Sequence, residues 1–358
     1  MAGPGALSGA GVRRPLFRAW LPWTWTPWRW IPWTWIPWGR LAQLAPVLFG
    51  IATLNFLILQ LAPGDVVDVL SGEAGAATPE TMAELRRSFG LDQPLPVQYL
   101  RYLGHLASFD LGHSYRLNMP VRELILTRLP PTLLLMLSAL VLAVSLGALA
   151  GLLAARHAGR WPDLLLSGLT LLSYALPTFW LGLMAIVLFS ARLGWLPSGG
   201  MLTIGAGHAG LAWLRDLLAH LVLPALTLST FYLAVYARLV RSAMLELHGA
   251  DFIRTARAKG AGEWRITLRH AFRNALLPMV TMAGYQAASL LSGAVLVETV
   301  FSWPGLGRLA YEAIRTRDLN LLLGILFFSS ILVVIVNLGI DGLYRLVDPR
   351  VTTGARRI

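Results

Sequence analysis

Few side chains in this sequence have the types and spacing that catalysis or metal binding requires. The only lysine, Lys259, is followed by Gly260, whereas a phosphate-binding P-loop needs a lysine followed by Ser or Thr. The patterns H-E-x-x-H and G-x-S-x-G are both absent. His105 and His113 have no carboxylate at ligand spacing, and no cysteine is available for a thiolate site. The sequence excludes a P-loop ATP site and offers no catalytic set, so we expect neither an enzyme nor a metal site.

The composition is that of a membrane protein. Hydrophobic residues make up 56% of the chain and charged residues only 13%, against about 25% charged residues in a soluble domain. Six apolar stretches have the ~20 residues that a membrane-spanning helix needs. We expect spans at 41–61, 132–155, 164–191, 217–238, 275–297 and 319–343. This predicts an all-α, polytopic membrane protein with six transmembrane helices.

The net charge of +12 is concentrated on one side of these spans. The loop after the fourth span and its flanks carry eight basic residues: Arg238, Arg241, Arg254, Arg257, Lys259, Arg265, Arg269 and Arg273. The positive-inside rule places this loop and both termini in the cytoplasm. Because this distribution accounts for most of the net charge, we expect membrane lipid and not nucleic acid as a partner.

The expected organisation has three parts. Residues 1–39 form an arm rich in Trp and Pro, either an interfacial anchor or low-complexity, disordered sequence upstream of the domain. Residues 40–351 form the membrane domain, and 352–358 a cytoplasmic tail. Within the domain, 63–131 is an extracytoplasmic cap loop with two short helices, the first beginning after Thr78 as N-cap. The cap covers the outer ends of the spans or docks a delivery protein.

The cytoplasmic loop 239–274 contains the most informative segment. Asp251 suits a helix start, and Gly260 suits a helix C-cap. Ala256 and Gly260 are four residues apart, so they share a face and form a small patch where another backbone can approach. Basic residues flank this patch: Arg254, Arg257 and Lys259. The residues alone leave two readings open, a helix that sits in another protein's groove and an interfacial helix that meets anionic lipid.

The stretch "FIRTARAKGAGEWRITLRHAFRNALLP" closely resembles the cytoplasmic coupling loop of ABC-importer permeases of the dipeptide/oligopeptide/nickel family. The wider family pattern is Glu-Ala-Ala, three residues, then Gly. It corresponds here to Arg254, Thr255, Ala256 and Gly260, without the leading glutamate. Other segments resemble the family in the expected order between about residues 40 and 351: "LAPGD", "GLDQPLPVQYLRYLGHL", "FDLGHSYR", "LPTFWLG", "LGWLPSGG", "VETVFSWPGLGRLAYEAIRTRD" and "VDPRV".

The resemblance implies an ABC importer (type I) permease fold and a subunit of an ATP-driven importer that carries peptides across the bacterial inner membrane. The implied partners are a second related permease, which completes a heterodimer, two ATP-binding subunits and an external substrate-binding protein. ATP and Mg would be held by the ATP-binding subunits, so no cofactor is expected on this chain. The residues implied in coupling to the ATPase are Asp251, Arg254, Thr255, Ala256, Arg257, Lys259 and Gly260. Nickel chelates or glutathione-like solutes remain alternative cargoes.

The fifth span and its exit are rich in small and polar residues, which makes them a candidate for the translocation path. The path candidates are Gln286, Ser289, Ser292 and Glu298. The alternative is helix packing, since small residues and serines are what membrane helix interfaces use. Packing is also what the stripe of small residues in the second span predicts: Ala143, Gly147, Gly151 and Ala155.

A stand-alone secondary transporter is the less favoured alternative from another class. Such a protein needs several membrane-embedded acids or histidines for its own coupling. Asp341 in the sixth span does not meet that requirement by itself, and we expect it to be the structural partner of an arginine.

Overall fold

The computed structural model describes residues 38–61, 67, 78–88, 90–114 and 116–347. Most of the predicted arm, the predicted tail and the side chain of Asp341 therefore lie outside the described residues. The chain divides into two compact units, Met1–Ala45 and Pro46–Ile358, and the second contains nearly all of the described helices.

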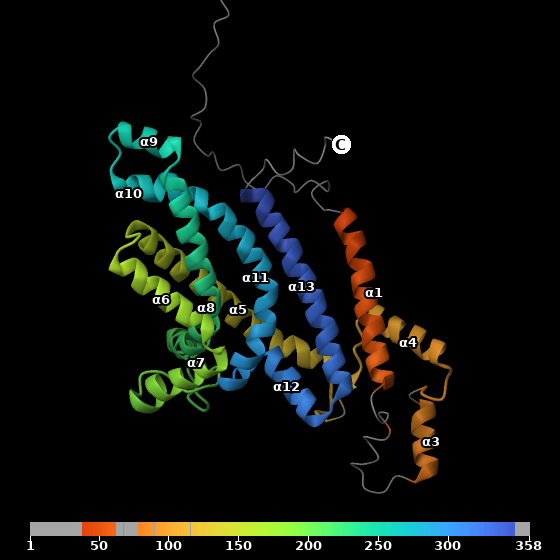
Figure 1. Cartoon of the computed structure of the whole chain (residues 1–358). Helices are drawn as coiled ribbons and strands as arrows, with labels where there is room; N and C mark the ends of the chain where they lie inside the picture. Colours follow the sequence, from red (N-terminus) through yellow and green to blue (C-terminus); the bar gives the residue numbers. More distant parts are fainter. Residues whose placement is uncertain (1–37, 62–66, 68–77, 89, 115, 348–358) are drawn as a thin grey trace, which may run out of the picture. The chain divides into compact units, whose positions relative to one another are not determined.

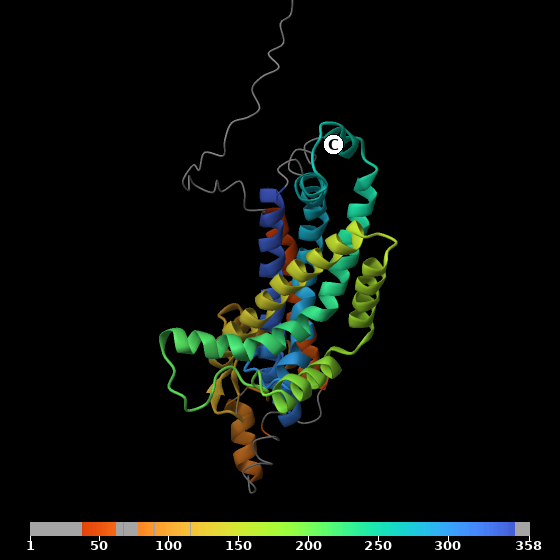
Figure 2. The same cartoon turned by 90° about the vertical axis from the view of Figure 1, so that its left-hand side faces the viewer.

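Helices make up nearly all of the described chain (Figures 1 and 2). They are α1 (Trp38–Leu61), α3 (Pro79–Ser88), α4 (Leu95–Ala107), α5 (Val121–Arg156), α6 (Trp161–Ala175), α7 (Thr178–Ala185), α8 (Gly210–His248), α9 (Asp251–Ala258), α10 (Glu263–Arg265), α11 (Arg273–Val300), α12 (Leu306–Thr316) and α13 (Leu319–Val347), with π-helical segments η2 (Ile186–Arg192) and η3 (Ile266–Phe272). In the described ranges the only strands are β1 (His113–Ser114) and β2 (Met119–Pro120), which pair antiparallel.

Helices occupy all six stretches expected to span the membrane, although the third is broken at Leu176 and Pro177. Three helices are long and apolar enough to cross a membrane, or up to five spans form if each of two bent helix pairs counts as one. The first stretch contains a shorter apolar helix, Ala45–Leu61. The structure thus supports a polytopic, mainly helical membrane protein, while six as the number of spans stays a prediction.

The third predicted span is a bent pair of helices and not one continuous helix. α6 and the segment Thr178–Arg192 are bent by 106° relative to each other. The break lies at Leu176 and Pro177, where Leu176 has φ −80° and ψ 135°. A residue that precedes proline is pushed out of the helical region by the proline ring, and proline has no N–H to continue the helix. Pro177 therefore ends α6 and redirects the chain into α7.

The small-residue stripe on α5 is a helix-packing seam, as predicted. A Cβ placed on Gly147 would lie 2.7 Å from the Cβ of Tyr236 and 2.8 Å from the carbonyl oxygen of Leu233, both on α8. Such distances leave no room for a side chain, so the two helix backbones approach as closely as glycine permits. One face of α5 is thereby held against α8.

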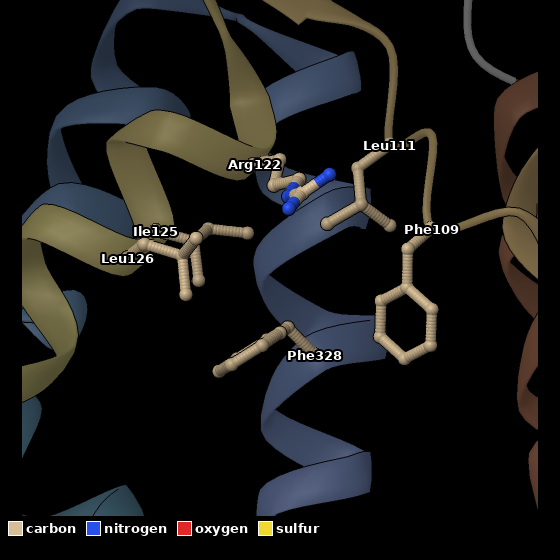
Figure 3. A pocket seen from close by; sticks show the side chains of 6 residues that line it. All are labelled: Phe109, Leu111, Arg122, Ile125, Leu126 and Phe328. Carbon is tan, nitrogen blue, oxygen red and sulfur yellow. The ribbon is translucent and has the colours of Figure 1, made fainter.

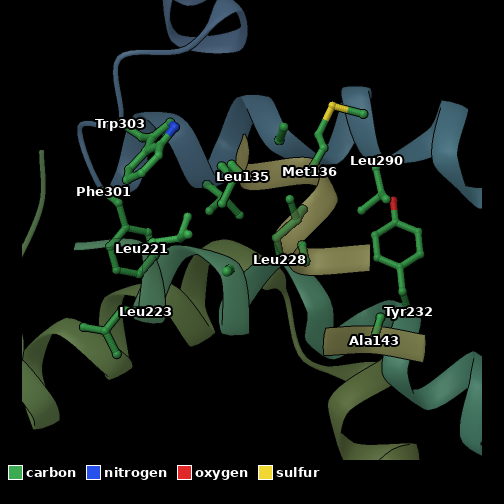
Figure 4. Packing of buried hydrophobic residues seen from close by; sticks show 14 of the residues in the cluster. Leu135, Met136, Ala143, Leu221, Leu223, Leu228, Tyr232, Leu290, Phe301 and Trp303 are labelled. Carbon is green, nitrogen blue, oxygen red and sulfur yellow. The ribbon is translucent and has the colours of Figure 1, made fainter. Parts of the chain in front are cut away.

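The main apolar cluster joins α5, α8 and α11 (Figure 4). Leu135 of α5, Leu228 of α8 and Leu290 of α11 are among its buried members, and Trp303 closes it beyond the end of α11. Burial of such side chains contributes roughly 1.5–3 kcal/mol each in water, but among membrane helices close packing replaces that driving force.

The first helix of the predicted cap begins where the sequence predicts. The Thr81 backbone N–H donates to the hydroxyl oxygen of Thr78 at 3.3 Å, which makes Thr78 the N-cap of α3. α4 packs against α1, where the rings of Phe56 and Tyr99 have centroids 5.1 Å apart. This contact shows that α4 covers the apolar helix α1, whether or not the cap also docks a delivery protein.

One contact in this region was not predicted. Nδ1 of His105 lies 2.9 Å from Oδ2 of Asp110. The other oxygen of Asp110 accepts the Gly112 backbone N–H at 3.0 Å, and this hydrogen bond lowers the pKa of Asp110. The pair therefore braces an exposed turn after α4.

Candidate coupling helix and translocation path

The helix α9 has the start and end that the sequence predicts. It begins at Asp251 and finishes at Ala258, after which Gly260 takes a positive φ of 78°. The Gly260 N–H donates to the Arg257 carbonyl at 3.0 Å, and the Ala261 N–H donates to the Ala256 carbonyl at 3.1 Å. These two bonds form the glycine-ended helix cap known as the Schellman motif. The positive φ at this position is therefore sufficient to explain why glycine is favoured there.

The inner face of α9 is attached to the membrane helices. Ile253 is buried in a second apolar cluster whose other buried members are Ala148, Leu152, Ala155, Val240, Met244, Ile266, Ala271, Ala275 and Met279, from α5, α8, η3 and α11. Ala256 is half-buried against the same cluster. Through this cluster α9 is joined to α5, α8 and α11, so a displacement of α9 should disturb the packing among them.

The outer face of α9 is exposed and includes a residue that sequence reasoning missed. Six of the seven predicted coupling residues are exposed: Asp251, Arg254, Thr255, Arg257, Lys259 and Gly260. Phe252 joins them with 42% of its surface exposed. Phe252 and Ile253 are adjacent in sequence, and a helix with one buried face can bury only one such neighbour. That adjacent apolar pair was the signal available in the sequence.

Arg257 braces α9 against α10. Its Nε and Nη2 donate to the two carboxylate oxygens of Glu263 at 2.8 and 3.2 Å. Hydrogen bonding to this carboxylate raises the pKa of the Arg257 guanidinium. Arg257 is thus engaged within its own chain, and Ala256 faces the chain's own core. The part of both residues in docking stays a prediction.

A partly buried ion pair joins α6 to α8, the helix that leads into α9. Nε and Nη2 of Arg241 donate to Oδ1 and Oδ2 of Asp163 at 2.7 and 2.8 Å. Asp163 also accepts the Gly159 backbone N–H at 2.9 Å, and only 4% of its side chain is exposed. This pair fixes the start of α6 to the end of α8 that leads into α9.

The carboxylate of Glu298, a residue of α11, lies against the N-terminus of α12. It is fully buried, and its oxygens accept the Thr132 hydroxyl at 2.7 Å and the Arg308 backbone N–H at 3.0 Å. Thr132 in turn accepts the Leu306 backbone N–H at 2.8 Å. A carboxylate at a helix N-terminus satisfies free N–H groups and the helix dipole. Through these hydrogen bonds, Glu298 holds the start of α12 against α5 and α11.

The other three path candidates lie on different sides of α11. Gln286 is buried, whereas Ser289 and Ser292 are exposed. Ser289 and Ser292 are three residues apart on a helix and therefore share a face. The structure brings these two serines together and does not place Glu298 with them.

A cavity at the start of α5 has none of these candidates in its lining. It has a volume of about 340 Å³ and is lined by Phe109, Leu111, Arg122, Ile125, Leu126 and Phe328 (Figure 3). The lining is apolar apart from Arg122, and it comes from the start of α5, from α13 and from the segment after α4. None of the path or coupling candidates contributes to it.

Comparison with known proteins identifies the family. The model described as "Binding-protein-dependent transport system inner membrane component" matches residues 147–353. The model described as "Binding-prot-dependent transport system membrane comp, N-term" matches residues 39–136.

The chain is also similar to named proteins. It is 42% identical over 312 residues to a putative peptide transport system permease protein of Brucella suis, covering 87% of this chain and 97% of that protein. It is 42% identical over 328 residues to the di/tripeptide transport system permease protein DppB of Pseudomonas aeruginosa, with the same two coverages. The dipeptide transport system permease protein DppB of Alkalihalophilus pseudofirmus is 38% identical over 328 residues, again 87% of this chain and 97% of that protein.

Among solved structures, the fold is similar to that of a chain of the MetNI methionine ABC transporter in inward-facing conformations. The TM-score is 0.50 at 20% identity, over 63% of this chain and 96% of that chain. This likeness shows the fold alone, that of a type I ABC importer permease. In such importers ATP hydrolysis lies with partner subunits, so this chain is not itself an enzyme. The chain belongs to the binding-protein-dependent transport system inner membrane components, which are multi-pass permease subunits of ABC importers.

Proposed function

We propose that this chain forms half of the translocation path of an importer for dipeptides or oligopeptides. The observation that carries this proposal is its 42% identity, over almost the whole length of the relatives, to proteins named as peptide and di/tripeptide permeases. The proposed assembly contains a second, related permease, two ATP-binding subunits that hold ATP and Mg, and an external binding protein that delivers the peptide.

The proposed contact with an ATP-binding subunit is the outer face of α9. Three properties support it: the exposed face holds Phe252, Arg254 and Thr255, the inner face is anchored by Ile253, and the helix is closed by Gly260. An element that is exposed on one side and anchored on the other is suited to transmit a movement. ATP-driven closure of the ATP-binding subunits then biases the permease between inward-open and outward-open states.

The proposed orientation follows from the positive charges of the loop that contains α9. With that loop in the cytoplasm, both termini are cytoplasmic and the cap formed by α3 and α4 is extracytoplasmic. On that side α3 and α4 are placed to meet the binding protein. The proposed domain division is an arm at 1–39, the permease domain at 40–351 and a tail at 352–358.

The proposed path runs along α11. Gln286, Ser289 and Ser292 supply neutral hydrogen-bonding groups there. We omit Glu298 from the path, because both of its oxygens are used to hold α12.

The coupling role is tested by one substitution made at two places. Thr255→Trp adds bulk to the outer face of α9, and Thr316→Trp adds the same bulk to an exposed position in α12, beyond the other end of α11. In the purified importer with its partner subunits, Thr255→Trp should lose the ATP-binding subunits or uncouple hydrolysis from uptake. Thr316→Trp should retain both activities. Equal behaviour of the two variants would overturn the assignment of α9.

The cargo is tested separately, in proteoliposomes that contain the complete importer and its binding protein. Uptake of a labelled dipeptide should be ATP-dependent and saturable. Exclusive uptake of glutathione or of a nickel chelate would keep the importer class and overturn the peptide assignment.

A further inference from the structure

Two buried polar atoms inside the helical bundle have no hydrogen-bond partner among the described residues. They are the hydroxyl oxygen of Tyr236 on α8 and the amide oxygen Oε1 of Gln286 on α11. The two residues are 0% and 5% exposed. Other buried polar side chains of these helices are bonded, for example Ser229, whose hydroxyl donates to the Leu226 carbonyl at 2.8 Å. Unpaired polar groups inside a membrane protein are costly, so their retention calls for an explanation.

Both atoms belong to the region where α5, α8 and α11 meet. Tyr236 is a member of the apolar cluster that also contains Leu290 of α11. Gln286 lies four positions before Leu290, at the bend of 56° between Pro278–Gln286 and Ser289–Val300. One turn before Tyr236, the ring of Tyr232 lies beside Leu290 (Figure 4). On its other side, Tyr236 has its Cβ against the glycine seam of α5, at Gly147. The two unpaired groups therefore lie on helices that pack against each other through one cluster.

The two groups are complementary to a peptide bond. A phenol hydroxyl can donate to a carbonyl oxygen, and an amide oxygen can accept an N–H. Both are neutral, so they would contact the backbone of a peptide without selecting the charge of its side chains. If the helices around the cluster separate in another conformation, the two polar groups can bind a peptide there. They then lack a partner only in the closed conformation.

We propose that Tyr236 and Gln286 form a binding point for the peptide backbone, which becomes accessible when α8 and α11 separate during transport. This inference rests on the proposed function, because it takes the cargo to be a peptide. It assigns a role in the path to Tyr236, which neither the sequence patterns nor the family comparison singled out. It also gives Gln286 a specific task, acceptance of a backbone N–H from the cargo.

Conservative substitutions separate this role from a structural one. Tyr236→Phe removes only the hydroxyl, and Gln286→Met removes the amide at similar volume. Ser229→Ala is the matched control, because it removes a buried hydroxyl of α8 that is already bonded within its own helix. In the complete importer, each test variant should keep or raise the thermal unfolding midpoint, since an unpaired polar atom has been removed. Dipeptide uptake, measured as Vmax/KM, should fall about two- to tenfold for each.

The outcomes are distinct. Wild-type uptake by both test variants would overturn the proposal and leave the two groups without a role in the path. Loss of stability together with uptake would also overturn it, because the groups would then have partners within the protein. Reduced uptake by Ser229→Ala to the same extent would show a general sensitivity of α8 and would count against a specific site.

A peptide that lacks the donor tests the assigned hydrogen bond directly. A dipeptide N-methylated at its peptide bond has no peptide N–H to donate to Gln286, while its N-terminal ammonium group is unchanged. The wild-type importer should discriminate between the plain and the methylated dipeptide more strongly than Gln286→Met does. The binding protein is the same in both assays, so a change in this ratio belongs to the permease. An unchanged ratio would overturn the role of Gln286, whereas absence of any peptide uptake by the wild-type importer would instead overturn the proposed function.

Discussion

Arg156, the last residue of α5, lies over the indole ring of Trp264 in α10, with its Cζ 4.0 Å from the ring centroid. This cation–π contact joins α10, which follows α9 in the sequence, directly to α5. Trp264 keeps 52% of its surface exposed, so the contact should contribute about 0.5–1 kcal/mol. The loop that contains α9 and α10 is thus attached to α5 in two ways, by this contact and by the apolar cluster around Ile253.

Removal of this contact should weaken coupling more than folding. We expect Trp264→Leu and Arg156→Gln each to lower the number of peptides imported per ATP by about two- to fivefold, which corresponds to the expected energy of the contact. The double variant should be no worse than the worse single variant, because both remove one interaction. The measurement is the ratio of uptake to hydrolysis in proteoliposomes. Trp161→Leu, at another exposed tryptophan, is the control, and a loss of the same size there would refute the specific role.

Gly260 should tolerate asparagine better than alanine. Its φ of 78° costs an ordinary residue roughly 1–2 kcal/mol, whereas asparagine adopts this region more readily. A Cβ at this position would meet nothing within 4 Å, so crowding within the chain is not the obstacle. Gly260→Ala should therefore reduce coupled uptake more than Gly260→Asn, with membrane insertion unchanged in both. The opposite order would indicate that a smooth surface for the ATPase, and not the backbone conformation, is what requires glycine.

Asp163 and Glu263 should differ in their contribution to stability, although both bind an arginine through two hydrogen bonds. Removing one partner of a buried pair costs about 3–5 kcal/mol. Because 34% of the Arg241 side chain remains exposed, we expect about 2 kcal/mol for Asp163→Asn. Glu263→Gln should cost less than about 1 kcal/mol, since both partners of that pair are about half exposed. Thermal unfolding of the detergent-solubilised importer measures both, and equal shifts of the midpoint would contradict this explanation.

Glu298→Gln should destabilise the protein without changing its affinity for cargo. The amide of glutamine places a donor where one carboxylate oxygen now accepts, and the N–H groups of the α12 N-terminus lose a negative partner. We expect a loss of about 1–3 kcal/mol for the group left unpaired. Thr132→Ser keeps both hydrogen bonds of Thr132 and serves as the tolerated control. An increase in KM at unchanged stability would return Glu298 to the translocation path.

Local patterns in the sequence predicted much of the fold. The N-cap at Thr78, the start of α9 at Asp251 and the glycine that closes it each depend on residues a few positions apart. Small residues repeated along α5 likewise predicted its packing seam. These features follow from periodicity and backbone preference, which a single sequence displays directly.

Features that depend on distant residues were not predictable in this way. Asp163 and Arg241 are 78 positions apart, and Thr132 and Glu298 are 166 apart, so no local spacing announces either pair. Pro177 was expected to be tolerated within a span, because membrane helices often accommodate proline, yet here it breaks the helix. Ala256 was expected on a docking surface but is half-buried on the inner face of α9, whereas Phe252 is exposed on the outer face.

The pairing of Arg241 with Asp163 has a consequence for how the protein is made. The insertion machinery reads the charges of an emerging, unfolded chain, whereas lipid headgroups meet the folded protein. Arg241 and Arg257 count as free cations in the first setting, but each is neutralised by a carboxylate in the second. In the proposed orientation, the same guanidinium groups would act as topogenic signals during biogenesis and form ion pairs within the folded protein. The surface charge that the mature permease presents to anionic lipid is accordingly lower than a count of its arginines implies.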